Sequence, residues 1–95
     1  MRRAAISSLL TFVLLAGCAG GDAGRALVEG AGPDEFVKLR AGPGLGYRII
    51  LGLPDGTSLR RRECATELGQ LWCRVSLSDA PQITGYVSAD YLSAQ

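Results

Sequence analysis

The stretch Val37-Lys38-Leu39-Arg40-Ala41-Gly42-Pro43-Gly44-Leu45-Gly46-Tyr47 changes its local preference half-way along. In its first part, Val37 and Leu39 alternate with charged side chains, which is the period of two of a half-buried strand. In its second part, three glycines and a proline within 41–46 are incompatible with either regular element and indicate a loop. A strand that runs straight into a Gly/Pro-rich loop favours a β fold.

The residues after this loop repeat the alternation of short apolar segments and turns. Ile49, Leu51 and Leu53 restore period two in a second strand, and the segment 54–57 (Pro-Asp-Gly-Thr) has the composition of a tight turn. Further elements are predicted in chain order: strands at 58–64 and 71–76, a loop at 77–84, a strand at 85–88, and a turn or short strand at 89–92. Five short strands without helical periodicity predict an all-β fold, a small five-stranded antiparallel barrel.

Two cysteines lie at equal distances from a potential hairpin turn. If Leu68-Gly69 forms a two-residue loop, Cys64 lies directly opposite Cys73, on a non-hydrogen-bonded pair where the two backbones are closest. Directly opposed residues are within reach of a disulfide, which persists in oxidising compartments. The alternative is two free, buried thiols. A redox role is disfavoured because the spacing is not Cys-x-x-Cys.

The strand before Cys64 carries an arginine run at 60–62. Strict alternation from Leu59 turns Arg61 and Glu63 inward, unless the strand is bulged, its end leaves the core, or the two side chains pair. The sequence leaves these three alternatives open. The run itself could contact phosphate or carboxylate groups, although a short charge run is more often a solvated surface.

These features follow one another in an order that resembles the bacterial Src-homology-3-type (SH3-like) domain over about residues 36–92. The most specific parts of the resemblance are the Arg40-x-Gly-Pro-Gly44 loop and the closing Gly85-Tyr86-Val87 with Tyr91-Leu92. The sequence departs from the family at Tyr86, where tryptophan is usual, and in its charged third strand. The resemblance implies an SH3-like domain at 36–95.

The amino terminus has the organisation of an export signal. Two arginines, Arg2 and Arg3, precede an apolar run that ends in Leu15-Ala16-Gly17-Cys18. This segment resembles a bacterial lipoprotein signal, which implies cleavage after residue 17 and lipidation of Cys18. A transmembrane anchor is disfavoured because the uncharged stretch is shorter than the about 20 residues of a spanning helix. An ordinary secretory signal, cleaved without lipid, is the remaining alternative.

The predicted signal also bears on localisation. Two or more acyl chains on Cys18 would give stable membrane anchoring in the cell envelope. In lipoproteins of this type an aspartate after the cysteine retains the protein at the inner membrane, whereas here the position is Ala19. The resemblance therefore implies the outer membrane, facing the periplasm, in a cell with two membranes.

A Gly/Ala-rich, acidic segment separates Cys18 from the strand pattern. Residues 18–35 contain few large apolar side chains and predict a flexible tether, with a short helical turn at 25–29 as an option. The expected organisation is thus a signal peptide at 1–17, a lipidated cysteine and tether at 18–35, and a domain at 36–95.

Composition excludes several classes of function. The chain has no histidine, so a Cys–His or Ser–His–Asp catalytic group cannot form within it, and a zinc site would depend on cysteines and carboxylates alone. The net charge of +1 does not predict a nucleic-acid partner. We therefore expect no enzyme activity, no cofactor and no metal.

The candidate ligand-binding residues are one cation and four aromatic residues beside the Gly/Pro-rich loop: Arg40, Tyr47, Trp72, Tyr86 and Tyr91. Alternation with Cys73 and Val75 predicts that Trp72 is at least partly exposed. Exposed aromatics with polar tips suit peptides or sugars. The competing interpretation is that these rings only cover a thin core.

The leading functional hypothesis is a non-catalytic binding module at the membrane, and the resemblance implies cell-wall peptide or an envelope protein as its ligand. The alternative is a structural or accessory subunit of an envelope assembly without a small ligand of its own. The residues leave the identity of the partner and the oligomeric state open.

Overall fold

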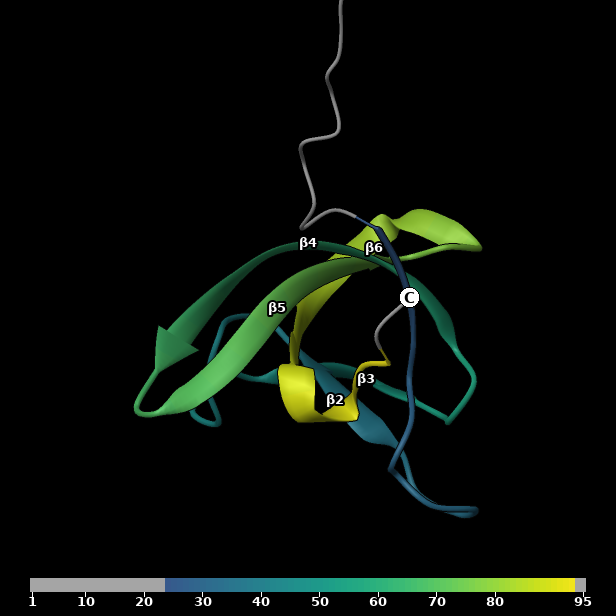
Figure 1. Ribbon diagram of the computed structural model, residues 1–95, viewed down its shortest axis with the longest axis horizontal. Helices are drawn as coiled ribbons and strands as arrows, with labels where there is room; N and C mark the ends of the chain where they lie inside the picture. The colour runs from purple at the N-terminus through teal and green to yellow at the C-terminus, as the bar shows by residue number, and fades with distance from the viewer. Residues whose placement is uncertain (1–23, 94–95) are drawn as a thin grey trace, which may run out of the picture.

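The computed structural model describes residues 24–93 and shows six antiparallel strands in one strongly curved sheet (Figure 1). The strands are β1 (Gly24–Leu27), β2 (Val37–Arg40), β3 (Ile49–Leu53), β4 (Ser58–Glu67), β5 (Gln70–Leu77) and β6 (Ala80–Ser88), followed by a short 3-10 turn, η1 (Ala89–Tyr91). Their order in the sheet is β1-β4-β5-β6-β2-β3. The predicted all-β antiparallel class is confirmed. The predicted signal peptide at 1–17 and Cys18 lie outside the described residues.

The core is enclosed because β4, β5 and β6 arch over β2 and β3 (Figure 1). Alternate residues of the strands point into this space, and the largest fully buried side chains include Leu39, Leu53 and Leu59. The crossing of β2 and β6 requires Gly85, since a Cβ there would lie 2.7 Å from the Leu39 side chain and 2.8 Å from the Arg40 carbonyl oxygen. The glycine of the closing motif is thus a packing requirement.

The β4–β5 hairpin has the predicted register. Glu67 pairs with Gln70 next to the turn, and Cys64 pairs with Cys73 further along the two strands. The two cysteines form a disulfide with a Cα–Cα distance of 3.9 Å, as expected where the backbones approach most closely. Cys73 is buried in the core, whereas Cys64 is on the exposed side of the bond.

A β-bulge in β4 decides among the alternatives for Arg61 and Glu63. The pairing shifts between Arg61, which faces Val75, and Cys64, so that two residues of β4 oppose the single Arg74. The bulge turns Glu63 outward, and its carboxylate accepts two hydrogen bonds from Arg74, of 2.6 and 3.0 Å. Arg61 is half-buried.

The Glu63–Arg74 ion pair lies at the surface. The hydrogen bonds from the Arg74 guanidinium lower the pKa of the Glu63 carboxyl, and the carboxylate in turn raises the pKa of Arg74. The stabilisation by Glu63 is present above the pKa that it has in the unfolded chain and is lost as the pH falls through its lowered pKa. Since the side chains are 38% (Arg74) and 62% (Glu63) exposed, solvent screens the pair and its contribution is small.

The predicted tether and helical turn are wrong for the residues around β1. Residues 24–27 form a strand on the edge of β4, and Val28 makes an isolated bridge to Leu92. Ala26 and Val28 are buried while Arg25 is exposed, so this short segment has a period of two. The sequence signal of this strand is weak because its inward side chains are few and small. The segment inserts between β4 and the C-terminal residues. The sheet therefore has six strands and not the predicted five.

The predicted loop at 77–84 is also wrong, because these residues belong to a β5–β6 hairpin. Leu77 pairs with Ala80 across a two-residue turn, and Ser76 pairs with Thr84. The extra residues on β6 form an irregularity that contains Pro81, which is where a strand tolerates a residue without an N–H group. The proline therefore marks a bulge and not the end of the strand.

The disulfide gives the first testable prediction. Its residues are separated by 9 positions, and closing a loop of this length in the unfolded chain contributes about 2–3 kcal/mol in the chain-entropy model. We expect reduction, or the double substitution Cys64→Ser with Cys73→Ala, to lower the free energy of unfolding by about this amount in denaturant titrations. Equal stability of the oxidised and reduced parent protein would contradict this expectation.

Candidate functional site

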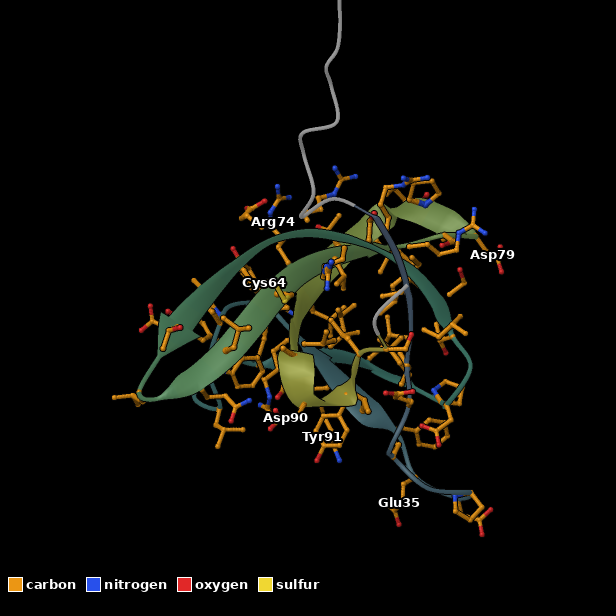
Figure 2. The ribbon with its side chains drawn as sticks, viewed as in Figure 1. Glu35, Cys64, Arg74, Asp79, Asp90 and Tyr91 are labelled. Carbon is orange, nitrogen blue, oxygen red and sulfur yellow. A yellow bond between two sulfur atoms is a disulfide. The ribbon has the colours of Figure 1, made fainter. Side chains whose placement is uncertain are left out.

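An open cleft of about 760 Å³ lies between the loop after β2, the tip of the β4–β5 hairpin and η1. Its apolar and aromatic lining comes from four separate parts of the chain and includes Phe36, Leu45, Tyr47, Leu68, Trp72 and Tyr91. Tyr47 and Tyr91 are 51% and 39% exposed. Figure 2 shows Glu35, Asp90 and Tyr91 on the same side of the molecule, away from Arg74 and Asp79.

Arg40 and Gly42 determine the shape of the loop that forms one wall. The guanidinium of Arg40 donates to the carbonyl oxygens of Leu45 (3.1 Å) and Tyr47 (3.0 Å), and so holds the second half of the loop against the end of β2. The ring of Tyr47 lies directly on Gly42, where a Cβ would be 2.5 Å from the ring. Arg40, predicted as a ligand-binding residue, lines the cleft but uses its charged group to hold the loop.

Trp72 lies at the floor of the cleft and not at its rim. It lines the cleft but is only 5% exposed, so the prediction of a partly exposed ring is wrong. Alternation predicts exposure only where one face of a strand is open to solvent. Here the loop after β2 and η1, which line the cleft together with Trp72, cover the face that carries this ring, so both Trp72 and the adjacent Cys73 are buried. Trp72 serves the core and the cleft together.

Leu68 at the hairpin tip is a cleft residue that the sequence argument used only as a turn residue. It has a left-handed backbone (φ 51°), and its side chain is fully exposed. A leucine in this conformation is strained by about 1 kcal/mol or more. Asparagine or aspartate followed by glycine would form this turn with less strain. Position 68 therefore carries a leucine although the turn itself favours a polar residue.

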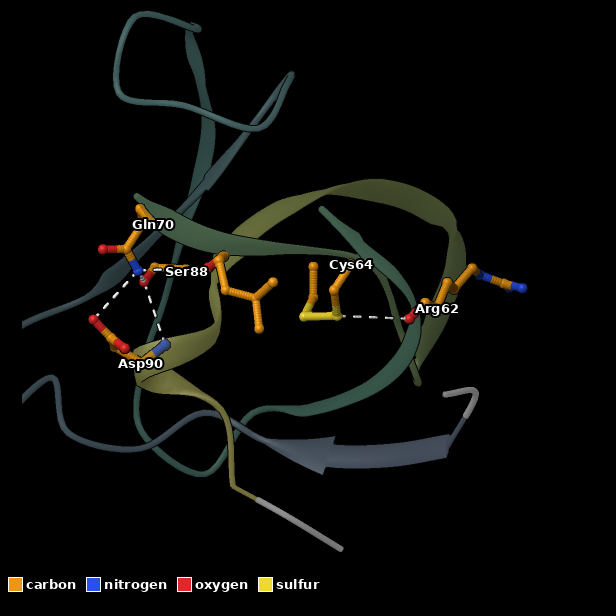
Figure 3. The surroundings of a disulfide bond; sticks show 7 residues. Arg62, Cys64, Gln70, Ser88 and Asp90 are labelled. Carbon is orange, nitrogen blue, oxygen red and sulfur yellow. Dashed lines mark hydrogen bonds between the residues drawn. A yellow bond between two sulfur atoms is a disulfide. The ribbon is translucent and has the colours of Figure 1, made fainter. Parts of the chain in front are cut away.

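The polar end of the cleft is built by Gln70, Ser88 and Asp90, none of which was a candidate residue. The amide nitrogen of Gln70 donates to Ser88 Oγ (2.6 Å) and Asp90 Oδ2 (3.2 Å), as Figure 3 shows. Ser88 Oγ also accepts from the backbone N–H of Asp90 and caps η1. The amide oxygen of Gln70 points away from this network and is available as an acceptor.

Tyr86 is not part of the cleft. It lies on β6 between Arg74 of β5 and Arg40 of β2, and it is half-buried. Of the five predicted residues, the structure brings together Arg40, Tyr47, Trp72 and Tyr91.

The charged residues of the cleft are mixed in sign. Glu35, Glu67 and Asp90 are acidic, and Lys38 and Arg40 are basic. Within residues 24–93 neither Glu35 nor Glu67 has an ion-pair partner, and these residues contain no group of His, Cys, Asp and Glu side chains that could hold a metal. The cleft can therefore offer aromatic faces, an amide and free carboxylates to a ligand.

The family follows from a comparison with known domain families. The model of the bacterial SH3 domain matches residues 35–93, which is more than half of the chain. The chain belongs to the bacterial SH3 domain family. No curated protein and no solved structure matches it significantly. Domains of this family are generally binding modules for cell-wall or protein partners. Strand β1 of this SH3 domain precedes the matched segment.

The contact between Gly42 and Tyr47 predicts unequal effects of two alanine substitutions in the SH3 domain. Gly42→Ala would place its Cβ 2.5 Å from the Tyr47 ring, whereas Gly44→Ala would place its Cβ at an ordinary 3.5 Å. We expect Gly42→Ala to displace the ring and to cost about 1–3 kcal/mol of stability, and Gly44→Ala to do neither. The NMR signals of the Tyr47 ring and thermal unfolding measure both effects. Parent-like Tyr47 signals in Gly42→Ala would contradict this account of the loop.

Proposed function

We propose that this SH3 domain is a non-catalytic binding module for a peptide of the cell wall or of an envelope protein, and that it is held at the membrane by lipid on Cys18. The observation that carries the binding part is the cleft itself. Two half-exposed tyrosines, Tyr47 and Tyr91, lie above the buried Trp72 in one open cleft. An aromatic groove with a few polar groups is the usual surface for a short extended peptide.

The polar groups suggest which part of a peptide each would contact. The free carboxylates of Glu35 and Glu67 can bind an amino group, and the Gln70 amide can bind peptide backbone. Aromatic rings pack against apolar side chains or sugar faces without requiring a particular sequence. Recognition in this cleft is therefore non-covalent, and selectivity depends on where the ligand carries its amine.

The proposed anchor is supported by the order of residues at the amino terminus, where Leu15-Ala16-Gly17-Cys18 follows an apolar run. Strand β1 begins at Gly24. The chain between Cys18 and Gly24 can span at most about 20 Å when fully extended. A lipid on Cys18 would thus hold the SH3 domain close to the membrane surface.

Truncation of Tyr47 tests the cleft. Tyr47→Ala should weaken binding to purified peptidoglycan at least about tenfold, because an aromatic side chain that packs on the ligand contributes ~1.4 kcal/mol or more. Ile49→Ala is the matched control, since Ile49 is 49% exposed, against 51% for Tyr47, but does not line the cleft. Equal binding by both variants and the parent would exclude this cleft. Absence of sacculus binding together with a stoichiometric co-purified protein would favour the role of an accessory subunit.

Mass analysis of the protein isolated from its native membrane tests the anchor. We expect a chain that begins at Cys18, carries acyl groups and, after reduction, offers two thiols to an alkylating reagent. The Cys18→Ala variant should keep its apolar amino-terminal segment and carry no acyl mass. A native chain that begins at Met1, with three alkylatable thiols after reduction, would overturn the proposed lipidation.

A further inference from the structure

A second, smaller pocket of about 320 Å³ lies on the outer surface of β1, β4 and β5 and shares no residue with the cleft. Its polar lining consists of three arginines and three serines: Arg25, Arg60, Arg62, Ser58, Ser76 and Ser78. We call it the Arg/Ser pocket. No acidic residue lines it. Such a concentration of one charge with hydroxyl groups differs from the mixed surface of the cleft.

The strand register brings the arginines together. Arg25 of β1 lies directly opposite Arg60 of β4, and Arg60 lies opposite Ser76 of β5. Like charges at directly opposed positions of an antiparallel pair are destabilising. Among residues 24–93, neither Arg25 nor Arg60 forms an ion pair with a carboxylate. The pair is therefore unfavourable unless an anion lies between its members.

Arg62 completes the pocket because of the bulge in β4. One nitrogen of its guanidinium donates to the buried Ser76 Oγ over 3.4 Å, while its Nε is buried without a hydrogen-bond partner. The positive charge of Arg62 contributes to the lowered pKa of the adjacent Glu63, but the Glu63 carboxylate accepts its hydrogen bonds from Arg74 and not from Arg62. A buried donor without an acceptor is costly, and because Nε itself is closed to solvent, an anion would have to bind the terminal nitrogens of the Arg62 guanidinium.

The serine hydroxyls add neutral donors to the same pocket. Ser58 Oγ and Ser78 Oγ are 2.9 Å apart and share one hydrogen bond. Ser76 Oγ is buried and accepts from Arg62, so it positions that guanidinium at the pocket. A phosphate group carries several acceptor oxygens and up to two negative charges, and guanidinium groups bind it through paired hydrogen bonds.

We propose that the Arg/Ser pocket binds a phosphate group. The proposal depends neither on the cleft nor on the lipid anchor, because the pocket is formed by residues 25–81 alone. The phosphate could belong to a soluble compound or to the headgroup of an anionic lipid. Both present the same oxygens to Arg60 and Arg62, and the experiment separates them.

The test uses the full chain in non-ionic detergent. Inorganic phosphate should shift the NMR signals of the Arg60 and Arg62 side chains, and should raise the melting temperature by about 6–11 °C at a tenfold excess over the dissociation constant, relative to chloride of equal ionic strength. Arg62→Gln should weaken phosphate binding at least tenfold. In chloride, Arg60→Gln should be no less stable than the parent, because it removes the repulsion from Arg25.

A second arm of the test replaces phosphate with vesicles of phosphatidylcholine, with or without phosphatidylglycerol. A response to phosphate identifies a soluble ligand, and a response to phosphatidylglycerol alone identifies a headgroup; either result supports the pocket. Arg48→Gln is the charge-matched control, because Arg48 is exposed and lies outside the pocket. The proposal fails if neither probe shifts the signals, if Arg62→Gln responds as the parent does, or if Arg48→Gln loses as much.

Discussion

The fold and both surfaces depend on the register of the β4–β5 hairpin. A slip of one residue would turn every side chain of a strand to the opposite face of the sheet. The Cys64–Cys73 disulfide prevents such a slip on one side of the bulge. On that side, the register places Trp72 under the cleft and Leu68 at its rim; on the other side it places Arg60 beside Arg25. The covalent constraint thus fixes the position of the aromatic groups, whereas the basic groups depend on the bulge in β4 and on the pairing of β4 with β1.

Local features of this structure could be predicted from sequence, and long-range ones could not. The hairpin register follows from counting outward from Leu68-Gly69, because directly opposed residues are fixed by the turn between them. In contrast, β1 forms only because β4 and the C-terminal residues offer it partners far away in the chain. The burial of Trp72 likewise depends on neighbours from several segments. The all-β class was predictable from the local pattern. The number of strands and the burial of Trp72 were not, because both depend on contacts between segments that are far apart in the chain.

The residues that carry the family resemblance act mainly on the backbone. Gly85 lets β2 and β6 cross, and Gly42 leaves room for the ring of Tyr47. Arg40 holds the loop that contains Gly42 and Tyr47. These residues explain why the motif indicates a fold so well and a ligand so poorly. The residues that would select a ligand lie outside the motif. They are the hairpin tip with Leu68 and the polar network around Gln70.

The two surfaces also differ in their charge. The cleft is lined by side chains of both signs, and two of its carboxylates, Glu35 and Glu67, have no ion pair, whereas the Arg/Ser pocket is lined by arginines without any carboxylate. Strand β1 belongs to the basic surface through Arg25. A chain attached to a membrane at Cys18 would therefore bring its basic surface close to the lipid headgroups, since Arg25 is only seven residues away. The cleft, which shares no residue with that surface, would remain accessible to a ligand in the surrounding envelope.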